Sequence, residues 1–313
     1  MVFFIIKRIF SVIPKAFTVV TLIFFIIRLG PGDPTEVILG DHASAEAVRI
    51  LREQLGLDRP ILNQYWDFLK GLIRLDLGNS YINNQPVIGQ LKNALPYSLE
   101  LTLGGILFGA ILGIPMGIIA AARKNKFPDY LCRVLSAIGI SFPAFLTGTI
   151  LLVFFSVKLE WFPAMGVGDY SNPIKHLHHL ILPSFSLGII ILAFVARMVR
   201  SSILEILNQD YIRTARGKGL SERNILFQHA LKNALIPIIT IIGLYSIISM
   251  VSAILIELVF SRPGLGTLII GAIKQSDFPT IQAALLTFAF FVIFVNLAVD
   301  ICYYVFDPRI RLK

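Results

Sequence analysis

The sequence predicts an all-α membrane protein with six transmembrane helices. Of its 313 residues, 56% are hydrophobic and 15% are charged, whereas soluble domains carry about a quarter of charged residues. Basic residues gather in alternate connections, as in multi-pass membrane proteins. Six apolar segments have about the 20 residues that a helix needs to cross a bilayer, and they cover residues 9–29, 98–122, 130–155, 179–199, 235–260 and 281–305.

The first apolar segment is expected to stay in the protein as a membrane span. Lys7 and Arg8 precede it, and no small-residue cleavage site follows it. A removed signal peptide has such a site after a shorter apolar run. Residues 1–29 are therefore predicted to hold a cytoplasmic N-terminus and the first transmembrane helix.

Residues 30–97 are polar and are predicted to form a helical insert outside the cytoplasm. Val48, Leu51 and Leu55 fit one face of a helix that Ser44 caps and Gly56 ends. Proline at position 60 opens a second helix, whose apolar side would hold Ile61, Tyr65, Phe68, Leu69, Leu72 and Ile73. The insert could pack rigidly over the helix ends or offer a docking surface.

Residues 98–305 are expected to form a five-helix core, in which prolines and glycines modify the spans. Pro115 and Pro143 fall inside the second and third spans and are predicted to kink them, because proline removes a backbone hydrogen bond. A glycine stripe recurs every fourth residue along the second span and would let another helix approach closely; it consists of Gly105, Gly109, Gly113 and Gly117. The approaching helix could belong to this chain or to a partner subunit.

Two polar residues lie one turn apart inside the last span, Asn296 and Asp300. A carboxylate within a membrane span is a functional candidate by default. However, Asp300 is close to the cytoplasmic end and basic residues follow it, so a structural partner is favoured over a proton relay.

Histidine and cysteine do not predict a metal site. His176, His178 and His179 could supply imidazole ligands, but the sequence offers no cysteine or carboxylate set near them. Cys132 and Cys302 both fall in apolar stretches, with neither a metal-binding spacing nor a disulfide framework. Both are expected to be inert.

The charge distribution predicts the orientation in the membrane. The side that holds the N-terminus, residues 123–129, residues 200–234 and the tail 306–313 carries 17 basic and five acidic residues when the flanking helix ends are counted with it. The opposite side carries 11 basic and 13 acidic residues. The positive-inside rule places both termini in the cytoplasm, and it explains the net charge of +9 without a nucleic-acid partner.

The basic segment 200–234 is predicted to form a helix–glycine–helix elbow at the cytoplasmic surface. Its first helix would continue from the fourth span, with Leu204, Leu207, Tyr211 and Ala215 on one face. Gly217 and Gly219 would end this helix, and Gly219 would adopt a left-handed conformation.

The second helix of the elbow would begin at Ser221, which can cap it, with Glu222 in its first turn. Its apolar face would contain Ile225, Leu226 and Ala230, and Pro237 would start the fifth span. A basic elbow could simply bind anionic lipid headgroups. The small residues and the apolar face beneath a defined turn favour insertion into a groove on another protein.

The stretch TARGKGLSERNILFQHALKNALIP (214–237) resembles the EAA loop of ABC importer permeases in the dipeptide, oligopeptide and nickel group. Ala215 and Gly219 match its small-residue positions, while Arg213 and Thr214 replace the Glu and Ala of the general motif. Further blocks resemble the same group: RLGPGDP (28–34), LGLDRPILNQYWDFL (55–69), LDLGNS (75–80), HLILPS (179–184), ELVFSRPGLG (257–266), SDFPTIQAALL (276–286) and NLAVDICYYVFDPRIR (296–311).

This resemblance implies the type I ABC importer permease fold and the role of a B-type permease subunit in a bacterial inner membrane. The implied partners are a second homologous permease, two cytoplasmic ABC ATPases and an extracytoplasmic solute-binding protein, beside membrane lipids. Di- or oligopeptides are the expected solutes, with nickel or a metal chelate as the alternative. The implied ATPase-coupling residues are Tyr211, Arg213, Thr214, Ala215, Arg216, Lys218, Gly219, Leu220 and Ser221.

The chain itself is not expected to hydrolyse ATP or to hold a cofactor. It has no G-x-x-x-x-G-K-[ST] motif, and GKG at 217–219 lacks the upstream glycine and the hydroxyl residue. ATP and Mg²⁺ are therefore expected on the partner ATPases. An ion-coupled secondary transporter and a channel are weaker alternatives, since apart from Asp300 the spans are poor in coupling carboxylates and no polar pore rings are apparent. A membrane enzyme is weaker too, because the histidines and carboxylates show no spacing that assembles a catalytic site.

Overall fold

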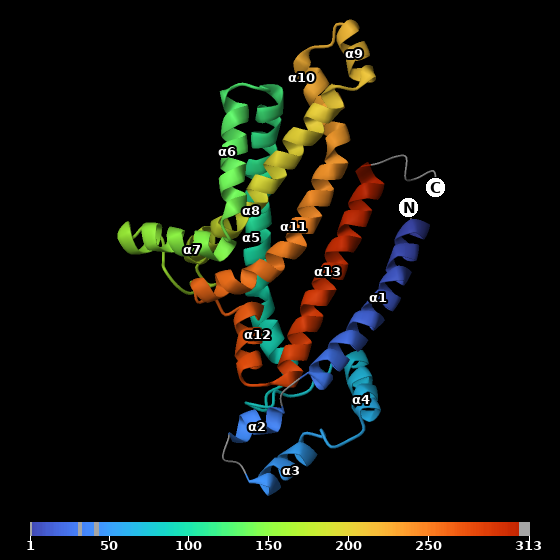
Figure 1. Cartoon of the computed structure of the whole chain (residues 1–313), viewed down its shortest axis with the longest axis vertical. Coiled ribbons are helices and arrows are strands. Elements are labelled where there is room, and N and C mark those ends of the chain that lie inside the picture. Colours follow the sequence, from blue (N-terminus) through green and yellow to red (C-terminus); the bar gives the residue numbers. More distant parts are fainter. Residues whose placement is uncertain (1, 31–32, 41–43, 307–313) are drawn as a thin grey trace. The chain divides into compact units, whose positions relative to one another are not determined.

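The computed structural model describes residues 2–30, 33–40 and 44–306, with side chains at Arg8 and from Phe10 onward. Its regular secondary structure is helical (Figure 1). Five helices in the described part are long and apolar enough to cross a membrane, and a sixth span results if one bent helix pair is counted as a single span. The all-α class therefore agrees with the sequence, and the predicted six spans are obtained when that pair is counted as one span. The predicted tail after Phe306 lies outside the described residues.

The chain divides into two compact units. The core unit comprises Met1–Ile5, Leu99–Arg262 and Phe294–Lys313. The insert unit comprises Ile6–Ser98 and Pro263–Ile293. The insert unit thus groups the predicted 30–97 segment with most of the first span and with a later part of the chain.

The insert unit holds most of one helix, four complete helices and the beginnings of two more. They are most of α1 (Val2–Leu29), all of α2 (Pro34–Leu39), α3 (Ala45–Gln54), α4 (Ile61–Ile73) and α12 (Leu265–Lys274), and the starts of α5 and α13. Asp33 caps α2, because its carboxylate accepts hydrogen bonds from the Thr35 amide at 2.9 Å and from the Thr35 hydroxyl at 2.7 Å, and it also pairs with Arg52.

The predicted helix caps of the insert are confirmed. Ser44 caps α3 by accepting a hydrogen bond from the Ala47 amide at 3.2 Å, and Gly56 after the helix has a φ of +65°. Val48, Leu51 and Leu55 form its half-buried face.

The apolar side of α4 packs against α1. The fully buried ring of Phe24 stacks on Phe68 with centroids 5.5 Å apart, and the Tyr65 hydroxyl lies 2.7 Å from that of Thr21. Ile73 was wrongly predicted on this side. It is the last residue of α4 and is 85% exposed, because the helix ends before its side chain can be covered.

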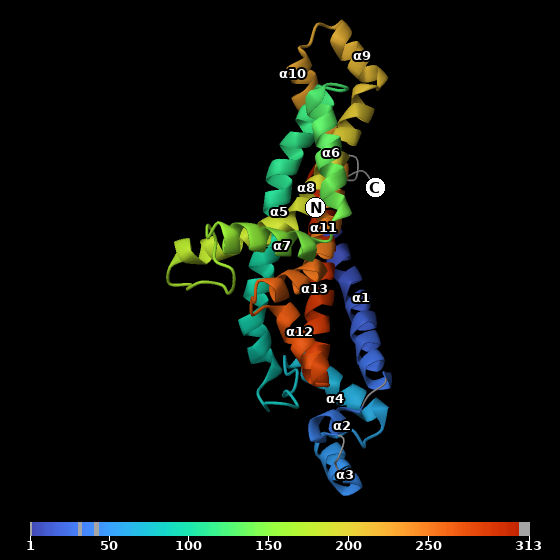
Figure 2. The same cartoon turned by 60° about the vertical axis from the view of Figure 1, so that its left-hand side comes forward.

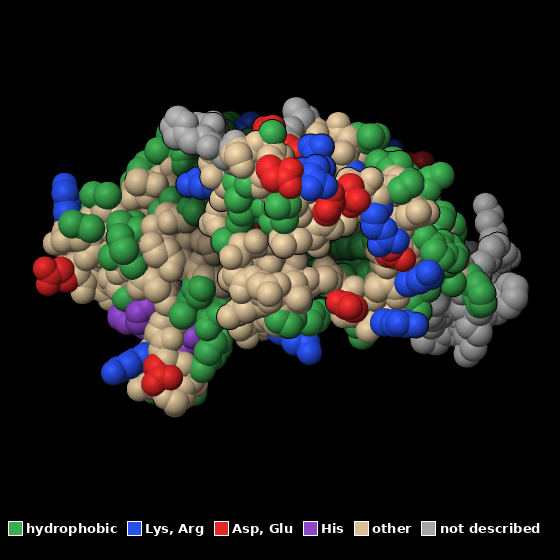
Figure 3. All heavy atoms as spheres, turned by 90° about the horizontal axis from the view of Figure 1, so that it is seen from below, with side chains coloured by type: hydrophobic (Ala, Val, Ile, Leu, Met, Phe, Trp, Pro, Cys, Tyr) green, Lys and Arg blue, Asp and Glu red, His purple; other side chains and the backbone are tan. Residues whose placement is uncertain are grey.

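The exposed side chains of α3 are mainly charged or polar, whereas those of α4 also include Leu62, Trp66 and Ile73. Basic and acidic side chains lie close together on the face of the molecule in Figure 3. Ion pairs such as Arg49–Glu53 at 2.6 Å and Arg59–Asp67 at 2.9 Å join charged residues of the insert unit.

In the core unit, α8 is the central helix. It contacts α6, α7 and α11, and it buries Val195, Val199 and Ile203 completely. The remaining elements of this unit are α5 (Val87–Ala122), α6 (Phe127–Ser141), α7 (Ala144–Leu151), the π-helical η1 (Leu152–Lys158), α8 (Pro173–Leu207), α9 (Asp210–Gly217), α10 (Glu222–Asn224), the π-helical η2 (Ile225–Leu231), α11 (Lys232–Val259) and the end of α13 (Phe278–Phe306). Figures 1 and 2 show α9 and α10 beyond the ends of α8 and α11.

The third predicted span is broken, not kinked. It bends by 100° between α6, which ends at Ser141, and the segment from Ala144 to Lys158. Phe142 is extended, with φ −104° and ψ 131°, as expected for a residue before proline. Pro143 therefore ends one helix and begins another. In contrast, α5 continues through Pro115 without a break.

Candidate functional site

The glycine stripe of α5 packs against α8 of the same chain. A Cβ atom added at Gly109 would lie 2.6 Å from Ile191 Cβ, and one added at Gly117 would lie 2.6 Å from the Ala196 carbonyl oxygen. Added at Gly105 or Gly113, it would lie 3.0 Å from α8. Glycine is thus required for this close approach of two long helices.

The first helix of the elbow does not continue from the fourth span, contrary to the prediction. α8 ends at Leu207, and Gln209 is extended with φ −73° and ψ 150° before α9 begins. This turn changes the helical register, so the predicted apolar face through Tyr211 is wrong. Tyr211 is 44% exposed, while Ile212 and Ala215 are buried.

The predicted left-handed glycine at the turn is confirmed. Gly219 has a φ of +82°, and its amide donates to the Arg216 carbonyl at 2.9 Å. The Leu220 amide donates to the Ala215 carbonyl at 3.3 Å, and the Leu220 side chain packs on the cluster formed by Ile212, Ala215 and Ile225. This pair of hydrogen bonds and the apolar contact define a Schellman motif.

The second half of the elbow begins as predicted but does not end at Pro237. The Ser221 hydroxyl accepts a hydrogen bond from the Asn224 amide at 3.4 Å, and Ile225 and Ala230 are fully buried. The helical segment then runs from Glu222 to Val259. Pro237 lies inside α11, since helices in membranes can re-satisfy the carbonyl that a proline leaves without a donor.

Two polar contacts join the halves of the elbow. Arg216 binds Glu222 through two hydrogen bonds, Nε to Oε1 at 2.7 Å and Nη2 to Oε2 at 3.2 Å, which raises the pKa of Arg216. The Asn233 amide donates to the Tyr211 hydroxyl at 2.9 Å. Sequence reasoning missed Asn233 because its partner lies in another helix.

The predicted coupling residues fall into two groups. Seven are exposed and could face a partner: Tyr211, Arg213, Thr214, Arg216, Lys218, Gly219 and Ser221. Ala215 is buried and Leu220 is half-buried beneath the turn. The small side chain at position 215 therefore fits the interior of the elbow itself.

A groove of about 450 Å³ lies beside the elbow, within the core unit. Lys124, Arg223 and the half-exposed ring of Phe227 line it. Near it, the buried carboxylate of Asp129 binds Arg200 of α8, with Arg200 Nη2 2.9 Å from Oδ2. Sequence reasoning missed this pair. Its one sequence signal is that Asp129 is the single acidic residue in the basic connection 123–129.

The three histidines point to three different partners. His176 Nε2 lies 2.8 Å from Glu100 Oε2, His178 Nε2 lies 2.9 Å from the Trp161 carbonyl, and His179 Nδ1 lies 2.8 Å from the carbonyl of Lys175. In the described residues, no group of three or more His, Cys, Asp or Glu is placed to hold a metal ion.

The other polar candidates are separate from the elbow. Cys132 is buried and Cys302 is half-buried, and both are free thiols. On α13, Asn296 is exposed and Asp300 is half-buried.

Comparisons with known proteins identify the family. Residues 113–312 match the model of the binding-protein-dependent transport system inner membrane component, and residues 1–102 match the model of its N-terminal region. The glutathione transport system permease protein GsiC of Escherichia coli O6:H1 is 39% identical over 310 residues, which cover 99% of both chains. The proteins of the same name from Escherichia coli K12 and Shigella dysenteriae serotype 1 are 38% identical with the same coverage.

The fold also matches a solved structure. An inward-facing structure of the MetNI methionine ABC transporter aligns with a TM-score of 0.56 and 20% identity, over 72% of this chain and 99% of that chain. This likeness supports the type I importer fold that the resemblance implied. The chain therefore belongs to the family of binding-protein-dependent transport system inner membrane components, as a permease of the dipeptide, oligopeptide and nickel group of ABC importers.

Proposed function

We propose that the chain forms half of the translocation path of an ATP-driven importer of short peptides, and that residues 209–231 couple it to a partner ATPase. The observation that carries the proposal is the construction of the elbow. Its turn is fixed by a Schellman motif, and its second half is continuous with a transmembrane helix. A rigid segment of this kind can transmit a movement of a partner to the membrane.

The exposed side of the elbow is the proposed ATPase contact. Arg213, Thr214 and Lys218 project from α9 and its end. Beneath them, Ile212, Ala215 and Ile225 form a buried cluster. The contact surface is thus supported by packing within the chain, so that a load on it is not absorbed by local unfolding.

The proposed complex contains a second homologous permease, two cytoplasmic ABC ATPases that hold ATP and Mg²⁺, and an extracytoplasmic solute-binding protein. Hydrolysis is assigned to the ATPases because this chain lacks a phosphate-binding motif. Both termini and the elbow are assigned to the cytoplasm by their excess of basic residues. Exposed apolar residues of α11, such as Leu244, Val251 and Leu255, offer surface to lipid or to the second permease.

Short peptides are the proposed solutes, with glutathione among them. The relatives that match almost the whole chain carry the name of a glutathione transport system, and glutathione is a tripeptide. Nickel and metal chelates are the competing solutes of the same group.

Reconstitution tests the proposal. The chain would be assembled with its partners in proteoliposomes, and ATP-dependent uptake of labelled glutathione and of a dipeptide would be compared with uptake of Ni²⁺. We expect peptide uptake that ATPase-inactive partners abolish and that a protonophore leaves intact. Uptake that survives inactive ATPases and fails with the protonophore would identify a secondary transporter, and uptake of Ni²⁺ alone would refute the peptide assignment.

A further inference from the structure

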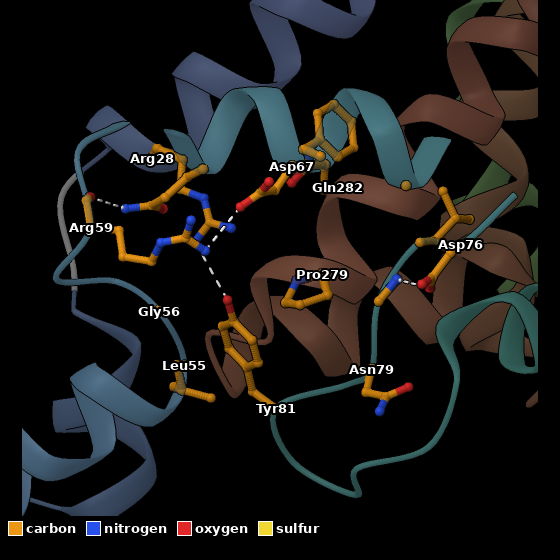
Figure 4. A pocket seen from close by; sticks show the side chains of 15 residues that line it. Arg28, Leu55, Gly56, Arg59, Asp67, Asp76, Asn79, Tyr81, Pro279 and Gln282 are labelled. Carbon is orange, nitrogen blue, oxygen red and sulfur yellow. Dashed lines mark hydrogen bonds and ion pairs between the residues drawn. The ribbon is translucent and has the colours of Figure 1, made fainter. Parts of the chain in front are cut away.

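A pocket of about 300 Å³ lies in the insert unit, far along the chain from the elbow (Figure 4). Residues from the end of α1, from α4 and its flanking loops, and from the start of α13 line it. Its volume is at the lower end of the roughly 300–1,000 Å³ that small-molecule sites occupy. The pocket can thus hold a small solute.

One side of the pocket carries a positive charge without a counter-charge. Arg28 has no ion pair among the residues that the structure describes; its Nη1 donates to the Tyr81 hydroxyl at 3.5 Å. Its Nε is buried and has no hydrogen-bond acceptor. The neighbouring Arg59 differs, because Asp67 neutralises it at 2.9 Å.

A second donor without an acceptor lines the same pocket. Gln282 is only 5% exposed, and its Nε2 has no hydrogen-bond partner. A buried donor that is left unsatisfied destabilises a protein, so such groups normally have a partner. A carboxylate fits both requirements, because it accepts hydrogen bonds and it balances the charge of Arg28.

The opposite side of the pocket carries a negative charge. Figure 4 shows Asp76 across the pocket from Arg28. Its Oδ1 accepts a hydrogen bond from the Gly78 amide at 2.9 Å, and in the described part of the chain Asp76 has no ion pair. The pocket therefore presents one uncompensated cation and one uncompensated anion on opposite walls.

We propose that this pocket binds a small zwitterion of the length of a short peptide, with its carboxylate at Arg28 and Gln282 and its ammonium group at Asp76. A phosphate dianion fits less well, because Asp67 and Asp76 would repel its second charge. The site belongs to the insert unit itself. Its assignment is independent of which solute the transporter carries.

Capped dipeptides on the unaltered protein give the first test. The assembled transporter, without its binding protein, would be placed in lipid nanodiscs, and the binding of dialanine, N-acetyl-dialanine and dialanine amide would be measured by equilibrium dialysis. Each cap removes one charge of the ligand. We expect each capped form to bind roughly tenfold or more weakly than dialanine, since a hydrogen bond to a charged group is among the stronger contacts.

Substitutions then assign each charge to a wall. Arg28→Gln should abolish the preference for dialanine over its amide, and Asp76→Asn should abolish the preference over the N-acetyl form. Arg49→Gln and Glu53→Gln are matched controls, since both residues lie on the exposed face of α3 outside the pocket. Neither control should change any of the three affinities.

Three results would overturn the proposal. Equal binding of the three ligands would show that no charge is recognised. Absence of dialanine binding would show that the pocket contains only water and binds no dipeptide. Weaker docking of the solute-binding protein to Arg28→Gln, with no dipeptide bound to the unaltered transporter, would assign the pocket to a protein carboxylate. Because the capped ligands need no mutation, misfolding of a variant cannot decide the outcome.

Discussion

The turn of the elbow depends on the backbone of one glycine, which a pair of substitutions can isolate. Gly217 and Gly219 lie two residues apart, and a Cβ atom at either position would meet nothing within 4 Å. Only Gly219 has a positive φ, of +82°. Gly219→Ala and Gly217→Ala therefore differ in backbone conformation and not in steric contact.

Only the substitution at Gly219 is expected to destabilise the turn. A side chain in the left-handed region costs about 1–2 kcal/mol, so Gly219→Ala should raise the opening constant of the Schellman hydrogen bonds about 5- to 30-fold. Alanine at position 217, which is helical, should be neutral or stabilising by about 0.5–1 kcal/mol. Hydrogen exchange of the segment 211–224 in the assembled transporter measures both changes. Faster exchange in Gly217→Ala, with unchanged exchange in Gly219→Ala, would refute the assigned role of Gly219.

The same position separates ATPase coupling from lipid binding. Gly219→Trp adds bulk at an exposed turn and should abolish solute-stimulated ATP hydrolysis if that turn enters a groove on the ATPase. Replacing both Arg216 and Lys218 with Gln removes lipid attraction of roughly 1 kcal/mol per charge and should reduce hydrolysis less. Normal stimulation in Gly219→Trp together with loss in the double variant would favour a lipid-binding loop.

Three further predictions concern packing, pH and orientation. Gly109→Ala should lower the free energy of unfolding of the transporter by roughly 1–3 kcal/mol through overpacking. Gly89→Ala should leave it unchanged, because a Cβ atom there would meet nothing within 4 Å. Equal melting temperatures of the two variants would contradict the packing role of the glycine stripe. Burial acts to raise the pKa of Asp33, but hydrogen bonds lower it below its usual 3.8. The protection of the α2 amides against hydrogen exchange should therefore fall as the pH drops below that value. Constant protection would argue against the cap that Asp33 forms on α2. In spheroplasts, a cysteine at Gln85 should react with an impermeant thiol reagent and one at Lys124 should not, and the reverse would invert the proposed orientation.

Sequence reasoning succeeded where a structure depends on neighbouring residues. Ser44 and Ser221 cap helices because their hydroxyls reach amides three residues later, and Gly56 and Gly219 adopt positive φ at helix ends. The spans themselves follow from their length and hydropathy. Each of these features is specified by a short window of sequence.

Sequence reasoning failed where the outcome depends on packing between distant segments. Proline at position 143 can kink or break a helix, and the bend of 100° shows that here it breaks one. The turn at Gln209 changes which residues of α9 face inward, so Ile212 replaces Tyr211 in the buried cluster. The pocket of the insert unit brings Arg28 and Gln282 together from opposite ends of the chain, and no local pattern predicts that meeting.

The elbow is attached differently at its two ends, and this asymmetry decides where a movement would go. On one side, the extended Gln209 separates α9 from α8, so that a change in its two backbone angles can absorb a displacement. On the other side, the helical segment runs from Glu222 to Val259, and the Arg216–Glu222 and Tyr211–Asn233 contacts bind α9 to it. A displacement of the turn by an ATPase would therefore pass first to α11, and through the packing of α11 on α8 and α7 to the rest of the core unit. Under the proposed coupling, α11 is the helix that receives the movement of the ATPase.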